Sequence, residues 1–146
     1  IALSTQVTEV IMFVPKSFLI APLALVMLID LALTLGCQPH GYWQNYTCCI
    51  ESSPIGHVLL SVGPGYFAAS FIAYALAIIF AGVKLPKPFN LVVFVAAFLG
   101  HAWGGSSWIP TLYSCFSTAQ INPWYLSVGY FCSIAAVAGI YCNRRT

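Results

Sequence analysis

The sequence contains very few charged residues. Only 5% of its 146 residues are Asp, Glu, Lys or Arg, whereas charged residues make up about a quarter of ordinary soluble domains. Hydrophobic residues make up 60% of the chain. A soluble domain of this length would leave about a third of its surface exposed, and this chain lacks the polar side chains to cover it. The composition therefore excludes a soluble domain and predicts an integral membrane protein.

Several functional signatures are also missing. The five Lys and Arg residues form no basic patch, so the sequence has no electrostatic footprint for a nucleic-acid partner. No Cys-x-x-Cys or His-Glu-x-x-His motif is present, which leaves no short redox or zinc motif to assign. The function must be sought in scattered residues instead.

Four apolar segments are long enough to cross a bilayer, since about 20 helical residues span its hydrocarbon core. They form one predicted membrane domain over residues 1–146, with spans at about 17–36, 56–83, 88–109 and 123–142. We expect the second span to be one helix kinked at Pro64, in preference to a short interfacial helix followed by a separate span. The run Gly104-Gly105-Ser106-Ser107 predicts a loosened outer end of the third span.

Basic residues give this four-helix bundle an orientation, because Lys and Arg near span ends stay on the cytoplasmic side. The four-span assignment places all five on one side of the membrane: Lys16, Lys84, Lys87, Arg144 and Arg145. Tryptophan prefers the membrane interface, and the four Trp residues fall in or beside the opposite loops. We therefore expect cytoplasmic termini, with loops 37–55 and 110–122 on the non-cytoplasmic side.

Acidic and histidine side chains within the outer half of the predicted bundle form a candidate site. Asp30 lies six residues before Gly36, or about 9 Å below the outer end of its helix at 1.5 Å per residue. His101 is expected at a similar depth, with Glu51 and His57 near the outer surface. These residue types bind metal ions and relay protons. The simpler alternative is that Asp30 hydrogen-bonds His101 or Thr34 and fixes the helix register.

The outer loops also contain cysteines, an aromatic cluster and one sequon. A structural disulfide from Cys48 or Cys49 to another outer cysteine is the favoured interpretation, and a redox-active thiol is the alternative. The candidate cysteines are Cys37, Cys48, Cys49 and Cys115. The candidate partner-docking residues are His40, Tyr42, Trp43 and Tyr46, which could instead anchor the loop at the headgroups. Asn45-Tyr46-Thr47 matches the glycosylation pattern.

Three functional hypotheses follow from these features. The short loops and small-residue helix faces favour a non-catalytic subunit of a larger membrane assembly, with lipid or pigment bound and with other membrane subunits as partners. The second hypothesis is a small transporter or intramembrane enzyme with a metal or proton site at Asp30, Glu51, His57 and His101. The third is an outer-side thiol-disulfide protein.

Overall fold

The computed structural model describes residues 16–116 and 122–143, and these form helices connected by turns, with no strand among them. This confirms the all-helical prediction. A membrane-spanning helix satisfies its own backbone hydrogen bonds, which is why apolar segments of this length adopt it. The α-helices are α2 (Lys16–Gly36), α3 (Pro54–Val62), α4 (Pro64–Lys84), α5 (Phe89–Phe116) and α6 (Pro123–Asn143).

Three of these helices are long and apolar enough to cross a membrane. They contain the stretches Leu19–Gly36, Pro64–Lys84 and Phe89–Ser114. In α6 the apolar stretch Trp124–Ile140 is shorter, although the whole helix has 21 residues. The chain is therefore described as a helical membrane protein with three candidate spanning helices.

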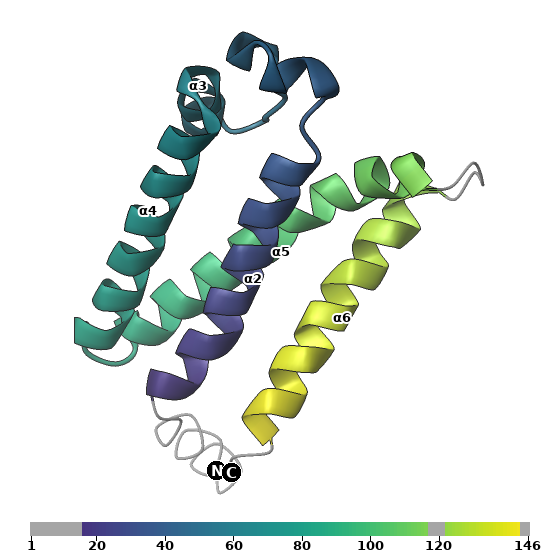
Figure 1. Ribbon diagram of the computed structural model, residues 1–146. Coiled ribbons are helices and arrows are strands. Elements are labelled where there is room, and N and C mark those ends of the chain that lie inside the picture. The colour runs from purple at the N-terminus through teal and green to yellow at the C-terminus, as the bar shows by residue number, and fades with distance from the viewer. Residues whose placement is uncertain (1–15, 117–121, 144–146) are drawn as a thin grey trace, which may run out of the picture.

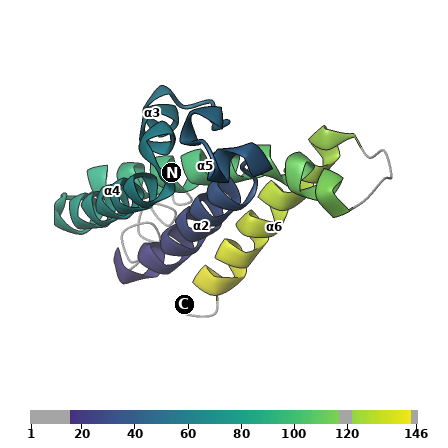
Figure 2. The same cartoon turned by 45° about the horizontal axis from the view of Figure 1, so that its top comes forward.

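Residues 56–83 do not form the single kinked helix that we expected. They belong to two helices, α3 and α4, which are separated at Gly63. Gly63 has φ of 150° and ψ of 157°, a backbone conformation that only glycine adopts without strain. Pro64 then occupies the first turn of α4, where the missing N–H costs no helical hydrogen bond. Gly63 and Pro64 together separate the two helices, because a proline disfavours helical backbone angles at the residue before it, and Figure 2 shows the resulting change of direction between α3 and α4.

The third helix is longer and more regular than predicted. α5 continues to Phe116 instead of ending near Ile109, so the segment 110–122 begins as helix. The expected loosening at Gly104-Gly105-Ser106-Ser107 is also wrong. The Ser106 and Ser107 hydroxyls donate to carbonyls one turn earlier in the same helix, over 2.7 and 2.6 Å, and the helix passes through them unbroken.

Helix α5 crosses the bundle and connects its parts. It packs against α2, α4 and α6, while α2 also contacts α4 and α6 (Figure 1). The start of α2, the end of α4 and the end of α6 lie at the same end of the bundle. The main core joins Leu23, Val26 and Met27 of α2 to Phe94 and Ala97 of α5.

A folded cap, residues 37–53, connects α2 to α3 at the other end of these two helices (Figure 1). It contains two short 3-10 helices, η1 (His40–Trp43) and η2 (Tyr46–Cys48). The Gln38 side chain donates to the Thr34 and Ile50 carbonyls over 2.8 and 2.9 Å, and it accepts from the Ile50 N–H at 2.9 Å. Residues 37–53 are thus a packed structure held by specific hydrogen bonds.

Candidate functional site

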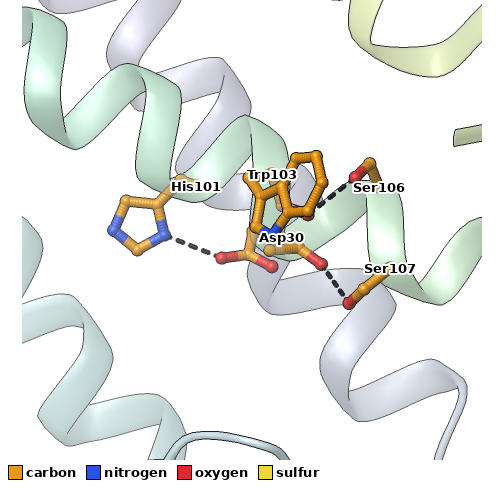
Figure 3. Close-up of polar contacts among 6 residues, drawn as sticks. Asp30, His101, Trp103, Ser106 and Ser107 are labelled. Carbon is orange, nitrogen blue, oxygen red and sulfur yellow. Dashed lines mark hydrogen bonds and ion pairs between the residues drawn. The ribbon is translucent and has the colours of Figure 1, made fainter. Parts of the chain in front are cut away.

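Asp30 of α2 and His101 of α5 form a direct pair inside the bundle. The Asp30 Oδ2 atom lies 2.7 Å from His101 Nδ1, and the two side chains are only 12% and 14% exposed. Figure 3 shows the carboxylate and the imidazole facing each other across the two helices. Placing an ionisable pair among apolar helices costs free energy, so such pairs usually mark a functional site.

Two consecutive glycines make room for this pair. A Cβ atom at Gly104 would lie 3.1 Å from both carboxylate oxygens of Asp30. A Cβ atom at Gly105 would lie 2.8 Å from the Tyr130 hydroxyl oxygen and 3.6 Å from the Asp30 Cα. Helix α5 therefore presents its bare backbone to α2 and α6 at this level. These glycines do not loosen the helix, as was predicted, but allow close approach of α2 and α6 to α5.

A cavity of about 720 Å³ opens beside the pair. Its walls come from α2, α3, α4, α5 and the connection before α3. The His101 ring forms one part of the wall and lies 5.3 Å from the Phe71 ring and 5.7 Å from the Tyr74 ring, measured between centroids. The aromatic and aliphatic side chains that line the cavity are Ile55, Leu59, Phe67, Phe71, Tyr74, Trp103 and Trp108.

Of the four residues predicted to form a metal or proton site, three share this cavity. Glu51 lines it together with Asp30 and His101, and its Oε1 accepts a 2.9 Å hydrogen bond from the Ser53 N–H. His57 is exposed on α3 and is not among the lining residues. Within the described part of the chain, no three His, Cys, Asp or Glu side chains are grouped closely enough to hold a metal ion. The predicted four-residue set is therefore not assembled as one ligand group.

The cysteines whose side chains the structure describes form no disulfide with one another. Cys48 is exposed, and Cys49 is buried with its thiol 3.6 Å from the His57 carbonyl. The Cys37 sulfur lies 3.9 Å from the Trp108 carbonyl. The side chain of Cys115 lies outside the described residues. Hydrogen bonds of Gln38 and Tyr42 fix the cap where a disulfide bridge was expected.

Tyr42 is a core residue of the cap and not part of its surface. It is completely buried, and its hydroxyl donates to the Leu60 carbonyl over 3.2 Å. Burial, with smaller effects from Cys49 and Tyr46, raises the pKa of Tyr42, so the phenol stays a neutral donor. Of the predicted docking residues, His40, Trp43 and Tyr46 are exposed, and Tyr42 must be removed from that set.

Asn45 lies on the exposed side of the cap. Its side-chain oxygen accepts hydrogen bonds from the Thr47 N–H at 3.1 Å and from the Thr47 hydroxyl at 2.8 Å. These contacts form a compact Asx turn that starts η2. The turn has a structural role of its own, whether or not the sequon is modified.

Sequence reasoning missed Tyr130 of α6. Its hydroxyl is buried and has no hydrogen-bond partner among the described residues, and it lies against Gly105. Its position contained a signal, because tyrosine usually lies at the ends of spans. Tyr130 is seven residues after Pro123, or about 10 Å into its helix, close to the depth expected for Asp30.

Comparison with known proteins gives no relative for this chain. No protein-family model, no curated protein and no solved structure matches it.

Proposed function

We propose that this protein is a four-span membrane protein that binds a small organic molecule in the cavity beside Asp30 and His101, as a small transporter or carrier would. The supporting observation is the polar pair in the wall of a largely apolar cavity of about 720 Å³. Pockets for small molecules typically have volumes of about 300–1,000 Å³ and few, well-placed polar groups. Intramembrane ionisable residues usually mark such sites or the paths that lead to them.

The proposed orientation keeps both ends of the chain and the 85–88 connection on the cytoplasmic side. Lys84 and Lys87 flank the end of α4, at the same end of the bundle as the start of α2 and the end of α6 (Figure 1). The positive-inside rule then places the cap 37–53 on the opposite side. In this orientation α6 is the fourth span, and the cavity lies toward the non-cytoplasmic half.

Native mass spectrometry of the full chain, extracted from its own membranes, tests the binding proposal. Gly100 lines the cavity, and a Cβ there would meet nothing within 4 Å, so Gly100→Phe fills space without a backbone clash. Gly139 of α6 is equally open but lies outside the cavity, which makes Gly139→Phe the matched control. We expect a small-molecule mass on the wild type and on the control that is lost in Gly100→Phe.

The proposal fails if the same bound masses appear on all three proteins. It also fails if the wild type carries nothing beyond bulk lipid while remaining folded. Circular dichroism of each sample supplies the folding check, because a collapsed variant would lose helical signal.

A second candidate is an accessory subunit of a membrane assembly. It is favoured by Ala135, Ala136 and Gly139 of α6, which are exposed although small residues usually occur where helices pack closely in lipid. Mild-detergent purification with Ala135→Leu as the variant tests it. A co-purifying membrane protein that is lost in the variant supports this role, and a free monomer in both samples argues against it.

A further inference from the structure

The described part of the cavity wall has more acidic than basic side chains. Two carboxyl side chains line it, Asp30 and Glu51, while no Lys or Arg does among the residues that the structure describes. Within the described part of the chain, the one basic side chain in the wall is His101, which is paired with Asp30. Two acidic side chains in the wall therefore face one imidazole.

Lys84 and Lys87, the Lys residues whose side chains the structure describes, lie far from the cavity. Lys84 and Lys87 flank the connection between α4 and α5, at the end of the bundle opposite the cap. The Lys84 ammonium lies 5.8 Å from the centroid of the Phe80 ring, which is not part of the cavity wall. An anionic molecule in the cavity would therefore face two carboxyl side chains with no described Lys or Arg beside it, and the imidazole of His101 is paired with Asp30.

The remaining wall is rich in aromatic rings, whose faces attract cations. Such rings bind organic ammonium groups within about 6 Å of the centroid, most strongly where water is excluded. Around His101 the rings of Phe71 and Tyr74 are already close, so the polar pair and the aromatic surface are continuous. The five aromatic side chains of the wall are Phe67, Phe71, Tyr74, Trp103 and Trp108.

We infer that the molecule bound in this cavity is a lipophilic organic cation. This inference rests on the proposed binding function and adds the chemical class of the ligand. Glu51 meets the cation near the cap, the aromatic rings pack against its apolar body, and Asp30 provides the second negative charge deeper in the wall. The cavity volume of about 720 Å³ suits a drug-sized cation.

Two ions of matched size and shape but opposite charge test this directly. The full chain is placed in lipid nanodiscs of zwitterionic lipid and dialysed against tetraphenylphosphonium or tetraphenylborate, with empty nanodiscs subtracted. We expect saturable binding of the phosphonium, at least about tenfold tighter than any saturable binding of the borate, because charge is the main difference between them.

Glu51→Gln tests whether the Glu51 carboxylate contributes to phosphonium binding. Glutamine keeps an oxygen that can accept from the Ser53 N–H, so the cap stays folded while one charge is removed. We expect phosphonium affinity to fall about threefold to tenfold and borate affinity to stay the same or rise. His57→Gln, on the exposed face of α3 outside the cavity, is the control and should change neither.

The outcomes separate the two proposals. Equal saturable binding of both ions, or tighter binding of the borate, overturns the cation inference but keeps the cavity as a binding site. Saturable binding of neither ion overturns the inference, and the Gly100→Phe comparison then decides the binding function independently. Unchanged phosphonium affinity in Glu51→Gln would also contradict the inference.

Discussion

Replacing His101 with phenylalanine should strongly destabilise the protein. Phenylalanine keeps the ring that packs against Phe71 and Tyr74 but removes the partner of the buried Asp30 carboxylate. Breaking a buried ion pair on one side costs about 3–5 kcal/mol, because a charge is left uncompensated. The cavity admits some solvation, so we expect about 3 kcal/mol.

A double-mutant cycle shows whether the cost comes from the charge. In Asp30→Asn the side chain has the same shape but no charge, and it still fits over Gly104. Adding His101→Phe to this background should cost only about 1 kcal/mol, the typical loss of a neutral hydrogen bond. The coupling between the two positions is therefore about 2 kcal/mol, or about thirtyfold in the unfolding equilibrium.

Reversible unfolding in mixed micelles, followed by circular dichroism, measures all four proteins of the cycle. Asp30→Asn with intact His101 is the reference that corrects for any effect of the amide itself. If the two substitutions were additive to within about 0.5 kcal/mol, the pair would carry no energetic coupling, and the reasoning about a buried charge would be refuted.

Three further predictions concern packing, the cap and sidedness. Gly82→Ala should lower the free energy of unfolding by about 1–3 kcal/mol, because its Cβ would lie 2.6 Å from the Phe94 ring. The control Gly139→Ala meets open space and should not destabilise the protein. Thermal unfolding compares the two variants. Tyr42→Phe should lower the free energy of unfolding by about 1 kcal/mol, because the hydrogen bond to the Leu60 carbonyl of α3 is lost. Backbone amides of the cap should then exchange hydrogen faster, and an unchanged exchange rate would contradict this prediction. The exposed Cys48 thiol should react with a membrane-impermeant maleimide added to intact cells, with Cys48→Ser as the control; labelling only after lysis would reverse the proposed orientation.

Hydropathy predicted the helices because lipid leaves an apolar segment few alternatives to a helix. The start of α2 and the extent of α6 therefore lie close to the expected bounds. The prediction of one helix over residues 56–83 was wrong, because a backbone angle divides this segment into two helices. Pro64 was recognised as a disruption, but the φ of 150° at Gly63 shows that the chain forms two helices.

The candidate site was only partly predictable from depth along the helices. Counting residues from the outer ends placed Asp30 and His101 at one level, and the structure pairs them. Depth gives no information on which helix face a side chain occupies. His57 was therefore grouped with Asp30 and His101, although it does not line their cavity. Tyr42 was predicted to be a surface residue. Its burial and its hydrogen bond to Leu60 depend on the fold of η1, which the sequence pattern does not reveal.

The glycines of α5 show a similar limit. Gly104 and Gly105 were read as a weak point of the helix, which is their usual meaning in isolation. In the bundle they are the contact surface for Asp30 and Tyr130, and this requires knowing which helices are neighbours. Local sequence does not contain that information.

Photocrosslinking in native membranes tests the central claim, a bound molecule in the cavity, most directly. One variant carries p-benzoylphenylalanine at Tyr74, which lines the cavity, and the control carries it at Phe80, which is exposed on the same helix outside the cavity. After illumination, mass spectrometry should find one discrete small-molecule adduct at position 74 and only bulk-lipid adducts at position 80. Identical lipid adducts at both positions would contradict the account.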